Sequence, residues 1–295
     1  MNDYLLSVVL GIIEGLTEFL PVSSTAHLRI AEALAAHQGW NINLADPYWK
    51  MYTVVIQLGA ILALPVYFWS RLMTFVKSFP KGERGERNLF NHPLSLVMIA
   101  FVCTAVPALL LKKKISANLE NLTVIGLALL IGGVVMWVVD AMFRKPTTLH
   151  TEEMTFGQAV WIGLCQTISA VFPGTSRSMA TIASGQIAGM SRPSALEFSF
   201  FLSIPTMLAA TGNELYHAIK PKAGHEADMM SPLHVTSHQW VLLAIGIAVS
   251  FVVALGVVAW FMGWVRKRGF APFAIYRIVL GAAVLIWVWR SGGSV

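Results

Sequence analysis

The sequence predicts an all-α polytopic membrane protein, folded as a single integral membrane domain over residues 1–295. Six transmembrane helices and two re-entrant helix pairs are expected, arranged in inverted-topology repeats. Three observations lead to this fold class. Of the 295 residues, 56% are hydrophobic and only 12% are charged, whereas soluble domains average about 25% charged residues. Long apolar segments alternate with basic connections, and two shorter apolar segments break at a proline and become rich in hydroxyls.

The first half of the chain opens with a broken pair. The apolar segment 4–20 stops at Pro21 and is too polar for a clean span of about 20 residues. A second short helix is expected at 24–37, so the two segments predict a hairpin that enters the membrane and returns. Such broken backbone is tolerated at membrane depth only inside protein or beside a watery cavity. Full spans are expected at about 51–69, 94–111 and 122–143, with a charged loop at 70–92.

The second half repeats this order. Segment 157–172 is short and apolar, ends before Pro173, and leads into a short helix that ends near residue 190. Full spans follow at about 195–217, 239–264 and 271–289.

A weak internal repeat supports this layout. Sliding the sequence by 152 residues aligns Glu14 with Gln166, Pro21 with Pro173, and Ser24 with Ser176. An odd number of spans separates the two broken pairs, so we expect them to enter from opposite faces and meet near the midplane. Repeat 1 then covers about 1–143 and repeat 2 about 157–290.

Basic residues predict the orientation. If loop 70–92 is cytoplasmic, loop 144–156 and the basic run 266–268 are cytoplasmic too, and these segments hold the larger share of Lys and Arg. The exceptions left outside are Lys112, Lys113, Lys114, Lys220 and Lys222. The net charge of +6 reflects these topological clusters, so no nucleic-acid partner is expected.

The first break follows two carboxylates in an apolar setting. Glu14 and Glu18 are four residues apart, so a helix presents both on one face. Like charges there are unfavourable unless a cation or a shared proton intervenes. Three interpretations stay open: a structural network with Arg177 or nearby hydroxyls, a divalent metal site, and acid–base catalysis.

Three hydroxyls and a histidine come directly after these acids. Ser23, Ser24 and Thr25 precede a helix, and capping of its N-terminus explains one of them. The helix start also favours an anion. His27 lies three residues past Ser24, so the two could meet on the first turn, where His27 could activate a serine or water or protonate a leaving group.

The second break carries Arg177 among small and hydroxyl residues. A guanidinium matches phosphate oxygens, so this segment predicts a phosphate cradle. The alternative is an arginine that extends to the membrane interface. The residues expected to bind the phosphate with Arg177 are Gly174, Ser176, Ser178 and Thr181.

Other polar groups receive supporting roles. Gln57 and Glu197 lie within or early in spans, and we expect them to support the site rather than to bind substrate. Asp140 and Arg144 are spaced for a local ion pair. Gly11 and Gly15 predict close helix packing.

These motifs resemble those of the undecaprenyl-diphosphate phosphatase family, also called the bacitracin-resistance family. EGLTEFLPVSSTAH and PGTSRSMAT are followed by IQLGAIL and EFSFFLSIP, and FAPFAIYRIVLG at 270–281 also fits. The match runs in order along nearly the whole chain. An E-x-x-x-E before P-V-S-S-T, combined with P-G-x-S-R-S, is a specific pattern.

The resemblance implies both a fold and a reaction. It implies two re-entrant pairs within six spans, and hydrolysis of the C55 isoprenyl diphosphate, which recycles the lipid carrier for peptidoglycan synthesis. A divalent cation, Mg2+ or Ca2+, is associated with Glu14 and Glu18. The site is expected to face the periplasm from the bacterial inner membrane. The implied active-site residues are Glu14, Glu18, Ser24, Thr25, His27, Ser176, Arg177 and Ser178.

The resemblance also sets the expected partners. These are the polyprenyl diphosphate and membrane lipids, with bacitracin acting on the lipid rather than on the protein, and a homodimer is left open. Ala26 and Met179 replace glycines that are usual in the family. Rival functions are a lipid-phosphate flippase or anion transporter, because inverted repeats with broken helices also build transporters, and a small-anion channel.

Overall fold

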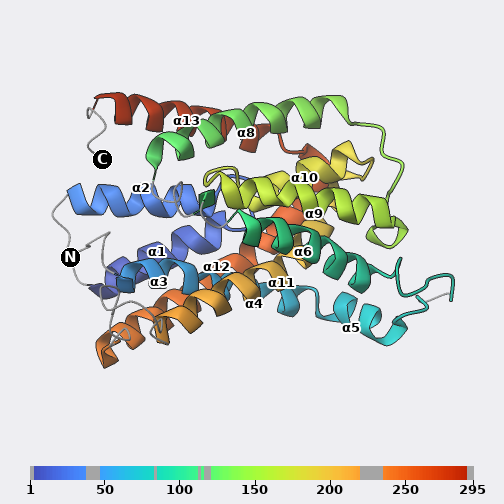
Figure 1. Cartoon of the computed structure of the whole chain (residues 1–295). Helices are drawn as coiled ribbons and strands as arrows, with labels where there is room; N and C mark the ends of the chain where they lie inside the picture. The colour runs from blue at the N-terminus through green and yellow to red at the C-terminus, as the bar shows by residue number, and fades with distance from the viewer. Residues whose placement is uncertain are drawn as a thin grey trace.

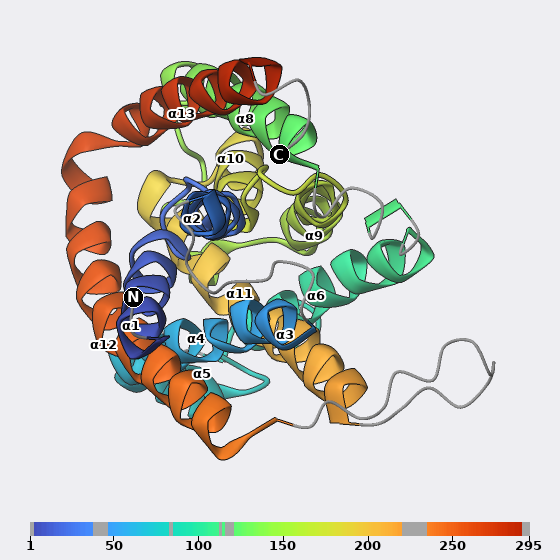
Figure 2. The same cartoon turned by 90° about the vertical axis from the view of Figure 1, so that its left-hand side faces the viewer.

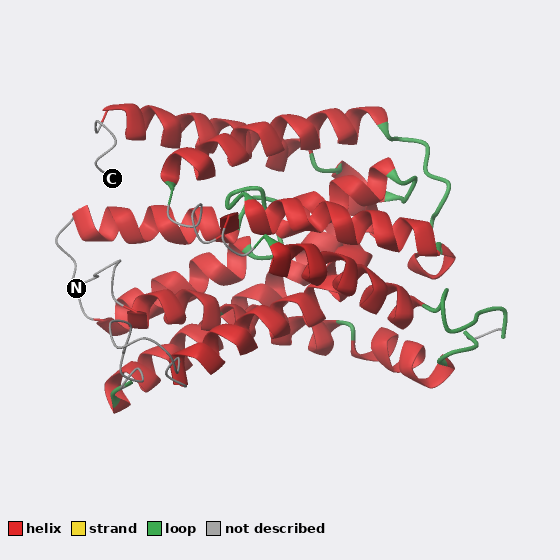
Figure 3. Cartoon of the chain, viewed as in Figure 1, coloured by secondary structure: helices red, strands yellow, loops and turns green. Residues whose placement is uncertain are grey.

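The computed structural model describes residues 3–37, 47–82, 85–111, 114–115, 121–219 and 235–290. Over these residues the regular structure is helical, apart from one isolated bridge between Thr148 and Met190 (Figure 3). Within these described ranges, six helical segments are long and apolar enough to cross a membrane. The predicted all-α, multi-pass fold class is therefore confirmed.

The helices of the first half agree with most of the predicted segments. They are α1 (Asp3–Thr17), α2 (Ser24–His37), α3 (Pro47–Val55), α4 (Gln57–Tyr67), α5 (Trp69–Ser78), α6 (Pro93–Leu110) and α8 (Leu122–Met142). The first full span consists of α3 and α4, which are separated at Ile56.

The prediction of a charged loop over 70–92 was wrong for the first part of this segment, which α5 occupies. The polar residues of α5 share one face, while Phe75 is buried and Leu72 packs against the core. The charged residues of this segment suggested a loop, although its apolar residues recur with the spacing of an amphipathic helix.

The helices of the second half begin with a short 3-10 turn, η1 (Thr151–Glu153). The helices are α9 (Phe156–Val171), α10 (Arg177–Ile187), α11 (Arg192–Ile219), α12 (Ser237–Arg268) and α13 (Ala271–Arg290). All of them lie within a few residues of the predicted segments.

Two pairs of short helices enter the bundle from opposite ends. Figure 1 shows α1 and α2 turning back near the middle from one end, and α9 and α10 doing so from the other. The connecting loops lie in the interior (Figure 3), and the end-on view places α2 and α10 near the centre of the bundle (Figure 2). Re-entry of these pairs into a bilayer stays a prediction.

The charged connections share one end of the bundle. The segments between α5 and α6 and between α8 and α9 lie together, while α1 begins and α13 ends at the opposite end (Figure 1). This agrees with the predicted grouping of these loops. Four of the basic residues that opposed the predicted orientation, Lys112, Lys113, Lys220 and Lys222, lie outside the described residues.

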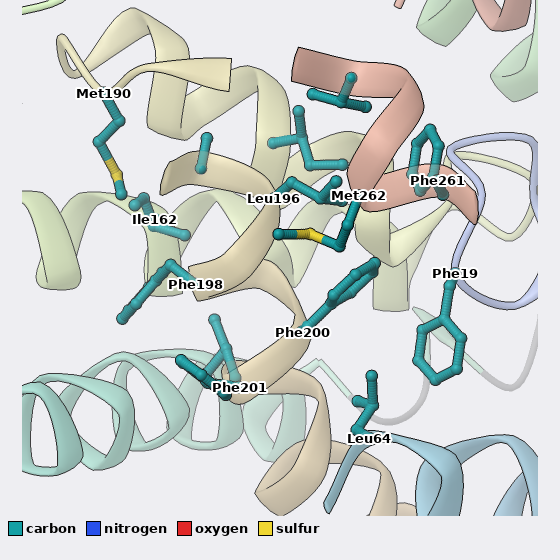
Figure 4. Packing of buried hydrophobic residues seen from close by; sticks show 14 of the residues in the cluster. Phe19, Leu64, Ile162, Met190, Leu196, Phe198, Phe200, Phe201, Phe261 and Met262 are labelled. Atoms are coloured by element: carbon teal, nitrogen blue, oxygen red, sulfur yellow. The ribbon is translucent and has the colours of Figure 1, made fainter. Parts of the chain in front are cut away.

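A hydrophobic core next to the first break fixes its position. Phe19 is fully buried and meets Phe200 of α11 edge-to-face, with ring centroids 5.2 Å apart. Figure 4 shows Phe19 near Leu64 and Phe200, within the cluster that also contains Phe198 and Phe201. Because Phe19 follows Glu18 directly, this packing also holds the second acid of the motif.

Glycines allow α12 to approach two other helices closely. A Cβ on Gly11 would lie 2.8 Å from the Gly246 carbonyl oxygen, and one on Gly15 would lie 2.7 Å from that of Ser250. The predicted close packing at this pair is confirmed, with α12 as the partner. A Cβ on Gly59 of α4 would lie 2.2 Å from the Ile247 carbonyl oxygen.

The predicted pair between Asp140 and Arg144 was wrong. Asp140 Oδ1 accepts a hydrogen bond from Arg192 Nε at 2.6 Å, and its Oδ2 accepts one from the Phe270 amide at 3.2 Å. Arg144 is exposed. A tertiary partner therefore replaces the local one and joins the ends of α8 and α11 to the α12–α13 junction.

We expect Gly59→Ala to lower the melting temperature of the purified protein in detergent by several degrees. The added methyl group meets backbone, so α4 and α12 must separate, and overpacking of this kind costs about 1–3 kcal/mol. The control is Gly256→Ala within α12, where a Cβ meets nothing within 4 Å and alanine is the better helix former. Equal melting temperatures for the two variants would contradict this packing.

Candidate active site

The two breaks end in the same local structure. Ser23 Oγ accepts a hydrogen bond from the Ala26 amide, and Ser176 Oγ accepts one from the Met179 amide, both at 3.4 Å. Both serines have positive φ, 74° and 70°, which is uncommon for residues other than glycine. Structurally, Ser23 therefore corresponds to Ser176, one residue away from the sequence alignment that paired Ser24 with Ser176.

This register makes Ser24 and Arg177 equivalent, because each is the first residue of its helix. Both side chains reach Glu18. Ser24 Oγ donates to Glu18 Oε2 at 2.5 Å, and Arg177 Nη2 donates to Glu18 Oε1 at 3.0 Å. A single carboxylate thus joins the two breaks, which come from opposite ends of the bundle.

The ion pair is almost fully shielded. The side chain of Arg177 is 11% exposed and that of Glu18 is 5% exposed. An arginine that extends to the interface is therefore excluded for Arg177. The predicted network between the acid pair and Arg177 is confirmed for Glu18.

Glu14 lies one helical turn before Glu18, whose amide donates to the Glu14 carbonyl oxygen at 2.9 Å. Glu14 is fully buried, and neither carboxylate oxygen accepts a hydrogen bond from the described residues. A buried carboxylate without a partner costs several kcal/mol, so Glu14 requires a proton or a cation.

The acid pair fits a hard divalent cation, which prefers carboxylate oxygens. Within the described ranges no group of three or more His, Cys, Asp or Glu side chains could hold a metal ion. A cation on Glu14 and Glu18 would therefore take further ligands from water or from a bound phosphate. Such shared coordination is typical of Mg2+.

Hydroxyl groups of the second break form hydrogen bonds with the first break and with α11. Ser178 Oγ donates to the Leu20 carbonyl oxygen at 3.0 Å and lies 3.0 Å from Ser176 Oγ. Thr181 Oγ1 lies 2.6 Å from Ser199 Oγ. The predicted residues Ser176, Ser178 and Thr181 therefore lie around Arg177, while Thr25 is partly buried in the first turn of α2.

Sequence reasoning missed Arg277. This guanidinium is fully buried on α13 and donates to the carbonyl oxygens of Pro21 at 3.1 Å, Gly174 at 3.0 Å and Ala128 at 3.2 Å. Arg277 thus connects the backbone of both breaks to α8. An ionisable residue inside an apolar span is the signal that could have identified it.

Glycines make room for this arrangement. Gly174 has φ of 95°, and a Cβ there would lie 2.6 Å from the Ile125 carbonyl oxygen. A Cβ on Gly132 would lie 2.4 Å from Arg277 Nη2 and 2.8 Å from Met179 Cε. The unusual Met179 is therefore accommodated in the core beside α8, and Ala26 is fully buried as well.

The hydrogen-bond partners of His27 are Ser23 and Tyr276, not the acid pair. Its Nδ1 lies 2.7 Å from the Ser23 carbonyl oxygen and its Nε2 lies 2.7 Å from the Tyr276 hydroxyl. Ser24 donates to Glu18 instead, so these contacts do not pair Ser24 with His27.

The two residues predicted to support the site are not among these contacts. Glu197 Oε1 accepts from Arg71 Nε at 2.9 Å and Oε2 from Thr151 Oγ1 at 2.7 Å, where α5, α11 and η1 meet. Gln57 is the partly buried first residue of α4.

Comparison with known proteins identifies the family. The sequence model of the family described as "Bacitracin resistance protein BacA" matches residues 7–283. The chain is 58% identical over 291 residues to an undecaprenyl-diphosphatase of Koribacter versatilis, covering 98% of this chain and 100% of that protein.

More distant relatives carry the same name. The chain is 38% identical to an undecaprenyl-diphosphatase of Rhizobium etli over 96% of both chains. It is also 38% identical to one of Caldanaerobacter subterraneus, over 95% of this chain and 94% of that protein. Because the family model matches nearly the full length and these relatives are 38–58% identical over at least 94% of their length, this chain belongs to the bacitracin-resistance (BacA) family.

Proposed function

We propose that this chain hydrolyses undecaprenyl diphosphate to undecaprenyl phosphate and inorganic phosphate, recycling the lipid carrier for peptidoglycan synthesis. One observation carries the proposal: the buried carboxylate of Glu18 is bound at once by Ser24 of one break and Arg177 of the other. The relatives named above, all called undecaprenyl-diphosphatase, support the substrate and the reaction.

The terminal phosphate binds between the starts of α2 and α10. Free amide groups at helix N-termini favour an anion, and Arg177 supplies a charged fork for phosphate oxygens. When the phosphate binds, Arg177 donates hydrogen bonds to its oxygens and gives up part of its hydrogen bonding to Glu18. Catalysis of phosphoryl transfer needs mainly positioning and charge stabilisation, which this arrangement supplies.

Glu14 and Glu18 would hold a divalent cation, Mg2+ or Ca2+. This assignment is supported by the burial of Glu14, because neither of its carboxylate oxygens accepts a hydrogen bond from the described residues. When bound, the cation neutralises charge on the diphosphate.

The candidates for the attacking group are Ser24, Thr25, His27 and a water molecule. Of these, the Ser24 hydroxyl already donates to a carboxylate at 2.5 Å. Glu18 can therefore take a proton from Ser24, or from a water that replaces its hydroxyl.

The protein works in the bacterial cytoplasmic membrane, with the breaks open to the periplasm and the polyprenyl chain running out between helices into lipid. The six apolar segments support the membrane location. Bacitracin acts on the lipid substrate, and a homodimer stays a prediction.

Arg177→Ala should reduce phosphate release from saturating polyprenyl diphosphate about 100-fold or more, because loss of a charge-stabilising donor has effects of that size. The assay uses purified protein in detergent, where no membrane separates two compartments, so phosphate release also excludes a pure flippase or transporter. Arg192→Ala is the control, since it removes an ion pair with Asp140 at the end of the bundle. Turnover by Arg177→Ala at the wild-type rate would refute the role of Arg177.

Glu14→Gln should raise the Mg2+ or Ca2+ concentration needed for half-maximal activity and lower the maximal rate, because one anionic ligand is lost. Phosphate release is measured as a function of added cation after chelation. Glu32→Gln serves as the control, since Glu32 is also buried but pairs with Arg29 at 3.1 Å. An unchanged cation requirement in Glu14→Gln would show that Glu14 is no metal ligand.

A further inference from the structure

Both ring nitrogens of His27 are engaged by neighbouring groups. Nδ1 lies 2.7 Å from the Ser23 carbonyl oxygen. A carbonyl oxygen can only accept a hydrogen bond, so Nδ1 carries the proton. In the neutral imidazole Nε2 is then a hydrogen-bond acceptor.

The group at Nε2 is the hydroxyl of Tyr276, at 2.7 Å. Because Nε2 accepts, the phenol donates. The two rings are nearly parallel, at an angle of 9° with centroids 5.6 Å apart. His27 is therefore held on one side by the N-cap residue of its own helix and on the other by α13.

The position of Tyr276 is itself fixed to the two breaks. The next residue, Arg277, donates to the carbonyl oxygens of Pro21 and Gly174. Yet 46% of the Tyr276 surface stays exposed, so this residue lies at the edge of the cluster rather than in the core.

We infer that Tyr276 is a positioning residue for His27 in the reaction proposed above, an inference that rests on that proposed function. The Ser23 carbonyl keeps the proton of His27 on Nδ1, and the Tyr276 hydroxyl, which donates to Nε2, orients the ring on the first turn of α2. The neighbouring hydrogen bond of a histidine sets which nitrogen can act. Tyr276 thus fixes the orientation of the His27 ring, while Ser23 fixes its tautomer.

The test is a double-mutant cycle on phosphate release, with kcat and KM measured separately for Tyr276→Phe, His27→Asn and the double variant. Phenylalanine keeps the stacked ring and removes only the hydroxyl. Misplacing a reacting group by about 1 Å can cost about 100-fold, so Tyr276→Phe should lower kcat about tenfold with KM nearly unchanged. In the His27→Asn background it should have no further effect, because residues that act through one another are not additive.

A second Tyr–His pair provides the matched control. Tyr4 OH lies 3.2 Å from His238 Nδ1, with the rings edge-to-face at 81°, and neither residue belongs to the breaks. Tyr4→Phe should leave kcat unchanged. An equal fold-loss from Tyr276→Phe in the wild-type and His27→Asn backgrounds would reveal a purely structural role, and an unchanged kcat in the wild-type background would also overturn the inference.

Nitrogen-15 NMR of histidine-labelled protein tests the same inference without turnover. The His27 signal, identified by its loss in His27→Asn, should show a protonated Nδ1 and an unprotonated, hydrogen-bonded Nε2. Tyr276→Phe should shift Nε2, and a proton on Nε2 in the wild type would overturn the inference. If wild-type protein releases no phosphate, the proposed function fails, while the NMR result still decides the role of Tyr276.

Discussion

The rest of the structure depends on one buried carboxylate that binds two partners from opposite ends of the bundle. Glu18 accepts from Ser24 and from Arg177, and each partner begins a helix that starts inside the protein. An ionised group removed from water is stable only when it is paired and hydrogen-bonded. Glu18 and Arg177 therefore require each other, and this requirement holds the two broken helix pairs against one another.

The pairing of the buried charges, rather than their sum, explains why the centre needs more than Glu18 and Arg177. With both acids ionised, Glu14 and Glu18 carry two negative charges, and Arg177 and Arg277 carry two positive charges. The pairing is unequal, since Arg277 binds carbonyl oxygens of both breaks and Glu14 accepts no hydrogen bond from the described residues. A cation would give Glu14 a partner, and the negative charge of a diphosphate at the helix starts would offset the charge that the cation adds, which is the physical basis of the proposed reaction.

Much of this could be predicted from sequence because hydropathy fixes where helices cross and where they break. Glu18 and Arg177 were identifiable because a charge in an apolar segment is costly. The prediction from local spacing was wrong where a tertiary contact replaced the local one, because Asp140 pairs with Arg192 rather than with Arg144. Helix α5 was missed for a different reason, because the charge of its segment suggested a loop. Arg277 carried the same signal, a charge inside an apolar span, but its carbonyl partners in both breaks and the one-residue difference in the capping register depend on how distant segments meet, which no spacing in the sequence encodes.

The most direct measurement is an experimental structure of the protein with Mg2+ and a non-hydrolysable polyprenyl diphosphonate. The account predicts the two phosphorus groups between the starts of α2 and α10, with Arg177 on the terminal group and Mg2+ held by Glu14 and Glu18. A head group bound elsewhere, or an Arg177 separated from both Glu18 and the terminal phosphorus group, would contradict the central role of this contact between the two halves.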